Sequence, residues 1–148
     1  MFIYNEIAIF AHMKILSTLL YAIFYTFSLL PLRVHYLLST MLYVLLRYVV
    51  RYRLNVVRKN VSTSFPEKSE QELRAIENGF YRFFCDYLVE SVKLMTIRKE
   101  NLKKRMDFKG VEQVDQCLHE GQSVAVYLGH YCNWEWVTSL PLWITSEA

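Results

Sequence analysis

The residues best suited to chemistry lie in the heptapeptide Gly129-His130-Tyr131-Cys132-Asn133-Trp134-Glu135. His130 and Glu135 are five positions apart, and both can face one cleft where an expected strand meets an expected helix. An imidazole has an unperturbed pKa of about 6.5, so near neutral pH it can accept a proton from a hydroxyl group. A carboxylate bonded to its other nitrogen would hold the required tautomer. The pattern predicts His130 as general base and Glu135 as its orienting partner, although on spacing alone it is weak, and a structural histidine is the alternative.

Other chemistries in this segment are less well supported by the sequence. No serine lies in a G-x-S-x-G elbow, so a hydroxyl of the substrate can serve as the nucleophile. Cys132 invites a thiol-nucleophile reading, but its position beside His130 gives poor geometry, and a free cysteine is usually a small buried hydrophobe. A metal site of His119, His130 and Cys132 lacks a fourth ligand at conventional spacing. We therefore expect no metal site.

The elements that would position this heptapeptide alternate between strand and helix. The sequence predicts a short strand over Met106–Lys109, a helix over Val111–His119 and a buried strand over Ser123–Leu128. Gly129 ends this strand, and a helical run that Pro141 bends begins at Trp134. Open α/β sheets place their chemistry at such strand-to-helix turns.

The composition of the whole chain excludes several classes of protein. Of its 148 residues 53% are apolar, which excludes general disorder. A net charge of +3 is too small to indicate a nucleic-acid-binding protein. We therefore expect no nucleic-acid partner. The cysteines Cys85, Cys117 and Cys132 form no CxxC motif, so we expect free thiols in a reducing compartment.

An uncharged run from Ile15 to Leu32 just reaches the length of a bilayer span, although Pro31 shortens it. The run from Val34 to Leu46 suits an interfacial or buried helix. Arginine and lysine side chains are concentrated after the apolar runs, while Lys14, His12 and Glu6 precede them, so the C-terminal side is expected in the cytoplasm. A cleaved signal peptide or a core helix of a soluble protein is the alternative to a membrane anchor. Met13 is an alternative start of the protein.

The middle of the chain, residues 51–105, is expected to be helical. A turn is predicted at Ser64–Lys68, and Ser69 with Glu72 has the spacing of a capping box. The helix then runs to about Thr96, and its apolar stripe, which includes Phe80 and Phe83, is expected to be core. The cations of Arg98–Lys109 are predicted as a solvated face, with contact to anionic lipid headgroups or an acidic carrier protein as the alternative.

The heptapeptide and its surroundings resemble the bacterial lipid A late acyltransferases, the lauroyl and myristoyl transferases of the lysophospholipid acyltransferase superfamily. The signature of that family is H-x4-D/E, often a histidine, an aromatic residue, a small residue and then Asn-Trp-Glu. His130, Tyr131, Asn133, Trp134 and Glu135 fit this pattern, whereas Cys132 is larger than expected. The upstream segment, with Arg58-Lys59-Asn60, Phe65-Pro66-Glu67, Ser69, Glu72 and Glu90, resembles the N-terminal half of the family.

The resemblance implies acyl transfer from an acyl carrier protein thioester, or less often from coenzyme A, to a hydroxyl of a lipid A precursor or related membrane glycolipid. His130 would be the general base and Glu135 its orienting partner, and Asn133 and Trp134 would shape the motif. The acyl donor is a co-substrate, so no resident cofactor is implied. The expected location is the bacterial cytoplasmic (inner) membrane, with the active site on its cytoplasmic face.

These observations predict an α/β fold in three parts. Residues 1–50 would form a membrane-anchoring helix and interfacial helices, 51–105 a region of amphipathic helices, and 106–148 the first part of an acyltransferase-type sheet domain. Members of the family are longer and carry later arginine-containing and proline-containing blocks, so we expect a truncated chain that is inactive alone. The alternative is a non-catalytic membrane-associated helical protein, or a remnant of such an enzyme.

Overall fold

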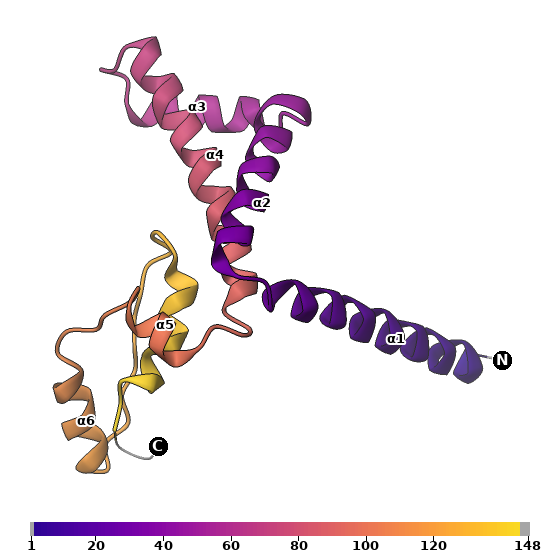
Figure 1. Cartoon of the computed structure of the whole chain (residues 1–148), viewed down its shortest axis with the longest axis vertical. Helices are drawn as coiled ribbons and strands as arrows, with labels where there is room; N and C mark the ends of the chain where they lie inside the picture. The colour runs from indigo at the N-terminus through magenta and orange to yellow at the C-terminus, as the bar shows by residue number, and fades with distance from the viewer. Residues whose placement is uncertain (1, 146–148) are drawn as a thin grey trace. The chain divides into compact units, whose positions relative to one another are not determined.

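The computed structural model describes the backbone of residues 2–145 and the side chains of residues 12–145. The side chain of Glu6 and the last three residues therefore lie outside the described part. The chain divides into two compact units, of which the first ends at Thr96 and the second begins at Ile97. The first unit contains α1 (Phe2–Ser28), α2 (Leu32–Val44), the π-helical turn η1 (Leu45–Val49), α3 (Leu54–Ser64) and α4 (Glu70–Lys93) (Figure 1). The second contains α5 (Lys99–Lys103), α6 (Val111–His119) and the 3-10 helix η2 (Trp134–Leu142).

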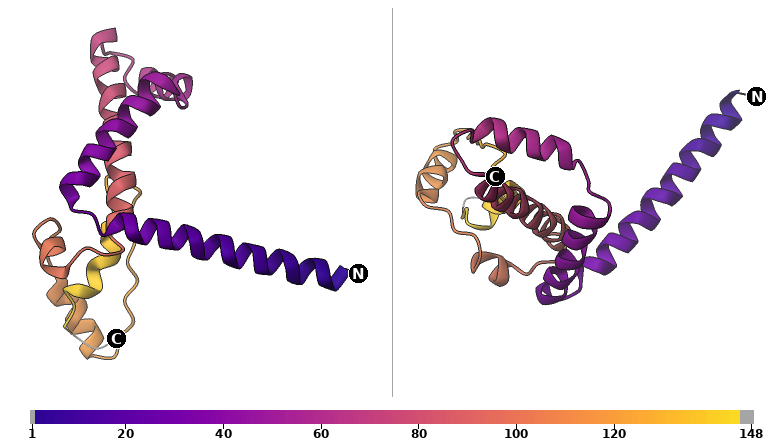
Figure 2. Two further views of the ribbon diagram at one scale, coloured as in Figure 1. Left: turned by 45° about the vertical axis from the view of Figure 1, so that its right-hand side comes forward. Right: turned by 90° about the horizontal axis from the view of Figure 1, so that it is seen from above.

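The first unit is built around α2 and α4, which pack side by side (Figures 1 and 2). Polar side chains fill their contact. The Ser39 hydroxyl donates to Oδ1 of Asp86 at 2.5 Å, and the Tyr36 hydroxyl donates to Oε1 of Glu90 at 2.6 Å. Because a hydrogen bond to a carboxylate is stronger than one between neutral groups, these pairs fix the register of the two helices.

A buried ion cluster continues this contact at the η1 end. Glu77 is only 2% exposed. Its carboxylate forms ion pairs with Nη2 of Arg47 at 2.5 Å and with Nε of Arg58 at 3.1 Å. The Nε of Arg47 donates to Oδ1 of Asn78 at 3.0 Å, and its guanidinium lies 5.5 Å from the ring centre of Tyr81. One carboxylate thus joins η1, α3 and α4.

The predicted core stripe of α4 is wrong, because the face of α4 that becomes buried is a different one. The residues of α4 that are buried are Glu77, Tyr81, Cys85 and Val89, whereas Phe80 and Phe83 are 43% and 45% exposed. Because Arg47 of η1 and Arg58 of α3 present guanidinium groups to α4, the face of α4 that becomes buried includes the Glu77 carboxylate that pairs with them. The helical spacing of the apolar residues had predicted that the apolar face would be the buried one.

The start of α4 confirms the predicted capping box. The Glu72 backbone N–H donates to the Ser69 hydroxyl, and the Ser69 backbone N–H donates to Oε2 of Glu72 at 2.9 Å. The preceding turn also forms as predicted, since α3 ends at Ser64 and α4 begins at Glu70.

The capping box makes stability depend on pH. Hydrogen bonds from the backbone and hydroxyl of Ser69, with the ammonium of Lys68, lower the pKa of Glu72 from its ordinary 4.5. A lowered folded-state pKa contributes stability above the unfolded-state pKa, and this is lost as the pH falls through the folded-state value. Between about pH 5 and about pH 3 the wild-type melting temperature should therefore fall further than that of Glu72→Gln. Parallel melting curves of the two chains would contradict this role.

The apolar run predicted as a membrane span, Ile15 to Leu32, does not form one helix. α1 ends at Ser28 and α2 begins at Leu32, after Pro31, which lacks an N–H and disfavours helical geometry in the residue before it. Within the described residues no single helix has the length and apolar character to cross a bilayer. The required length and apolar character are found only in a pair of helical segments taken together, His12–Ser28 and Leu32–Val49, which are bent by 113° relative to each other.

The bend is held against α4 by side chains that donate hydrogen bonds to carbonyls at and just after the end of α1. The Lys93 ammonium donates to the Ser28 carbonyl at 2.7 Å and to the Leu30 carbonyl at 2.9 Å, and the Thr96 hydroxyl donates to the Ser28 carbonyl at 2.6 Å. Burial lowers the pKa of Lys93. The ammonium also interacts favourably with the C-terminal end of the α1 dipole.

Replacing Lys93 with methionine should loosen this fastening. The variant keeps the length of the side chain but leaves the Leu30 carbonyl without this donor and the Ser28 carbonyl with the Thr96 hydroxyl alone, which should cost about 1 to 2 kcal/mol. Hydrogen exchange of amides near the end of α1 should become faster. Lys59→Met removes an exposed ammonium from α3 and is the control. Equal exchange in both variants would show that Lys93 does not hold the bend.

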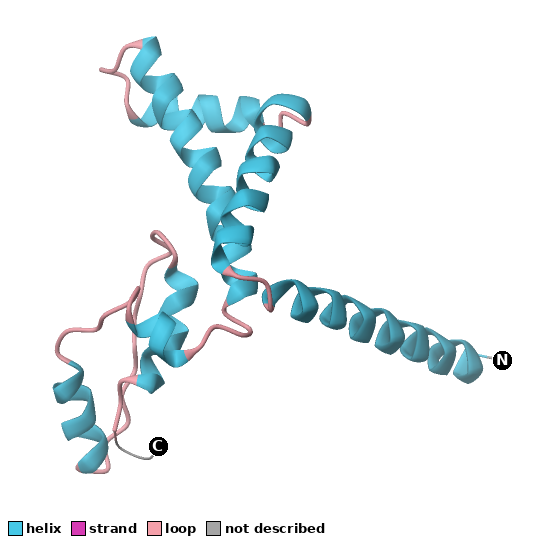
Figure 3. Ribbon diagram, viewed as in Figure 1, coloured by secondary structure: helices cyan, strands magenta, loops and turns pink. Residues whose placement is uncertain are grey.

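The predicted α/β fold is wrong for the part of the chain that the structure describes. Residues 2–145 contain helices and loops but no strand (Figure 3). Ser123–Leu128 is an irregular exposed segment in which Tyr127 is 95% exposed, and Met106–Phe108 is also irregular. A strand is defined by its hydrogen bonds to a neighbour, and no described segment pairs with either one. The helix over Val111–His119 and the helical run from Trp134 are confirmed, the latter as a 3-10 helix.

The second unit has a small core under its helices. Leu102 of α5, Val111 of α6 and Trp136 of η2 are buried. Asp115 of α6 accepts bonds from the backbone N–H and hydroxyl of Thr145, each at 2.9 Å, which joins α6 to the segment after η2.

Candidate active site

The predicted motif forms an irregular turn that leads into η2. The Tyr131 N–H donates to the Gly129 carbonyl at 2.8 Å, and Cys132 has a left-handed φ of 52°. This places His130 beside Trp134, with their ring centres 4.6 Å apart and their planes at 64°. An edge-to-face contact of this kind favours one orientation of the exposed imidazole.

Glu135 and Asn133 are half-buried. Asn133 directly precedes η2, and Glu135 is in its first turn, where a carboxylate is favoured by the positive end of the helix dipole. The Thr138 hydroxyl donates to the backbone carbonyl of Glu135 at 2.7 Å. The orienting bond between Glu135 and His130 stays a prediction.

An open apolar groove of about 320 Å³ begins at the same tryptophan. It is lined by Val126, Leu128, Trp134, Val137, Thr138, Leu140 and Pro141. The groove shares Trp134 with the ring contact of His130, so an apolar chain in the groove would lie next to the turn that holds the imidazole. Sequence reasoning missed this groove, although Val137 and Leu140 have the i, i+3 spacing of one helical face.

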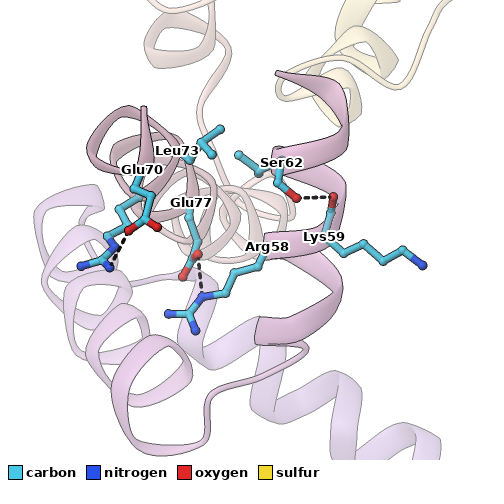
Figure 4. A pocket seen from close by; sticks show the side chains of 8 residues that line it. Arg58, Lys59, Ser62, Glu70, Leu73 and Glu77 are labelled. Carbon is cyan, nitrogen blue, oxygen red and sulfur yellow. Dashed lines mark hydrogen bonds and ion pairs between the residues drawn. The ribbon is translucent and has the colours of Figure 1, made fainter. Parts of the chain in front are cut away.

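A second cavity, of about 340 Å³, lies between α3 and α4 in the first unit (Figure 4). Its most deeply buried ionisable group is the carboxylate of Glu77, which is bonded to Arg58 of the lining and also to Arg47 of η1. Arg74 is likewise paired with Glu70 at 3.3 Å. Because the buried carboxylate has two guanidinium partners, it is better suited to holding helices together than to accepting a proton.

The cysteines do not gather at the motif. Cys85 is fully buried, and that burial, together with the charge of Asp86, raises the pKa of its thiol. Cys117 is half-buried in α6, and Cys132 is exposed. Within the part of the chain that was searched, no three His, Cys, Asp or Glu side chains lie close enough to hold a metal ion, so His119, His130 and Cys132 form no such site.

The described geometry is thus an exposed imidazole on a turn, in contact with a tryptophan that also lines an apolar groove. The family model for bacterial lipid A biosynthesis acyltransferases matches residues 8–141. The chain therefore belongs to this family, as its sequence pattern predicted, and its general role is that of an acyltransferase in lipid A biosynthesis. No curated protein and no solved structure matches the chain significantly.

Proposed function

We propose that this chain takes part in moving a fatty acyl group from a thioester to a hydroxyl of a lipid A precursor or related membrane glycolipid, with His130 as general base. The observation that carries the proposal is the placement of His130 against Trp134, which also lines the apolar groove. The proposed reaction needs a proton acceptor beside a surface that can hold an acyl chain, and this contact supports that arrangement.

In the proposed reaction, His130 removes the proton from the acceptor hydroxyl as its oxygen attacks the thioester carbonyl. The C–O bond forms, the C–S bond breaks, and the thiolate leaves with the proton that the imidazolium returns. Glu135 would keep the ring in the required tautomer and stabilise its positive charge. Asn133 and Trp134 would hold the shape of the turn.

We infer that the acyl donor is an acyl carrier protein thioester, with coenzyme A as the alternative. The exposed cations of α5 and the residues that follow it support an acidic carrier as the partner: Lys99, Lys103, Lys104 and Arg105. Lys103 lies 5.1 Å from the ring centre of Trp143, which positions one of these charges. The proposed location is the cytoplasmic face of the bacterial inner membrane, supported by the cations that follow the apolar runs.

Lipid analysis tests this proposal in cells. A strain lacking the gene would be complemented with the full-length gene, as wild type or as His130→Ala, and its lipid A examined by mass spectrometry. We expect the additional acyl chain to return only with the wild type, while both proteins are present in the membrane fraction. Equal acyl-chain counts in the two strains would instead support a non-catalytic, membrane-associated helical protein.

A further inference from the structure

The helix formed by α2 and η1 has its polar side chains inside and its apolar side chains outside. The side chains of His35 and Ser39 are fully buried and Arg47 is 9% exposed, whereas Leu37 and Met41 are each 62% exposed. In a water-soluble helix the apolar face is the buried one. The reversed arrangement is expected where the outer face meets hydrocarbon and the inner face pairs its polar groups with another helix.

The exposed apolar residues form one continuous stripe. It consists of Leu37, Met41, Val44, Leu45 and Tyr48, spaced as one helical face, and continues into Val49 and Val50. Val49 is 69% exposed, and no described segment covers the stripe. A contiguous apolar surface on a folded chain marks an interaction site.

Cations lie at both ends of this outer stripe. Arg33 precedes Leu37 by one helical turn, and Arg51 and Arg53 follow the stripe directly. The two later arginines have left-handed φ values of 55° and 50°, and they line an open hollow of about 480 Å³. No acidic residue occurs between Glu6 and Glu67, so the charge of this region complements anionic phosphates.

We propose that the outer stripe of α2 and η1 lies in the surface of an anionic phospholipid bilayer. The apolar residues enter the boundary between headgroups and acyl chains, Arg51 and Arg53 contact headgroup phosphates, and α4 covers the opposite, polar face of α2. The chain is thereby attached at a surface separate from α1. This attachment does not depend on catalysis by His130.

Site-specific fluorescence tests the attachment. An NBD fluorophore would be placed on Met41→Cys, and in the matched control on Ala75→Cys of α4, in a full chain carrying Cys117→Ser and Cys132→Ser. In vesicles of phosphatidylglycerol and phosphatidylcholine, the label at residue 41 should show blue-shifted emission and be quenched by lipids with a nitroxide on the acyl chain. The label at residue 75 should show neither effect. Equal spectra at the two positions would overturn the proposal.

The charge of the vesicle tests the role of the arginines. Quenching at residue 41 should be stronger in anionic vesicles than in phosphatidylcholine alone, and Arg51→Asn with Arg53→Asn should remove that difference. Asparagine tolerates a left-handed backbone, so the turn is kept. Lys68→Gln with Arg74→Gln removes the same charge from the α4 side and should leave the difference intact. Shielding of residue 41 that requires an added acidic carrier protein would show a protein partner and overturn the proposal.

Discussion

Replacement of His130 with alanine is expected to lower the rate of acyl transfer by about 10²- to 10⁴-fold, the usual contribution of general acid–base catalysis. The imidazole is exposed and packs against the ring of Trp134, so its removal buries no charge and opens no core cavity. We therefore expect the fold to be unchanged. The measurement is the transfer of a radiolabelled acyl group to lipid acceptor by membranes that contain equal amounts of each full-length protein.

Neighbouring residues supply the controls for this rate. Cys132→Ser removes the competing nucleophile and should retain activity, whereas Glu135→Gln should reduce it because an amide cannot stabilise an imidazolium as a carboxylate does. Full activity of His130→Ala together with loss in Cys132→Ser would transfer the chemistry to the thiol. Wild-type rates in both variants would place the reaction elsewhere in the protein.

Replacement of Glu77 with alanine is expected to lower the free energy of unfolding by about 3 to 5 kcal/mol. The substitution leaves the guanidinium of Arg47 buried without the carboxylate that balances its charge, and Arg47 and Arg58 lose their common partner. Urea denaturation followed by circular dichroism measures this loss. A change below about 1 kcal/mol would indicate that water reaches the cluster and replaces the carboxylate.

Two further variants separate the ion pair from simple loss of packing. Arg58→Met removes the half-exposed partner of Glu77 and should cost only about 0 to 1 kcal/mol. Arg47→Met combined with Glu77→Leu replaces the buried pair by apolar groups and should recover much of the stability lost in Glu77→Ala. A double variant as unstable as Glu77→Ala would show that the shape of the cluster matters more than its charge.

Local signals in the sequence predicted local structure well. The capping box of Ser69 and Glu72 depends on residues three apart, so their spacing is sufficient to predict it. Pro31 acts on its own residue and its neighbour, so the sequence showed where the apolar run would shorten, although it did not show that the two helices bend by 113°. The family was also predictable, because the His130–Glu135 motif is a short contiguous pattern.

The predicted strands are absent from the described residues, because a strand depends on a partner segment that is not local in the sequence. Ser123–Leu128 has the composition of a buried strand, but strand formation requires a pairing segment, and no described residues supply one. The core face of α4 failed similarly, since Phe80 is exposed and Glu77 is buried. A period identifies the apolar face of a helix, yet the neighbouring helix decides which face is covered.

The sequence by itself determined the helix boundaries at Ser69 and Pro31, the family and the motif around His130, because each depends on residues close together in the chain. Only the tertiary structure decided that α2 turns Ser39 and Arg47 inward and leaves Leu37 and Met41 outside, and that Trp134 belongs to both the turn of His130 and the apolar groove. These features depend on contacts between distant segments. A hydrogen bond such as that from Ser39 to Asp86 joins residues 47 positions apart, which no local pattern records.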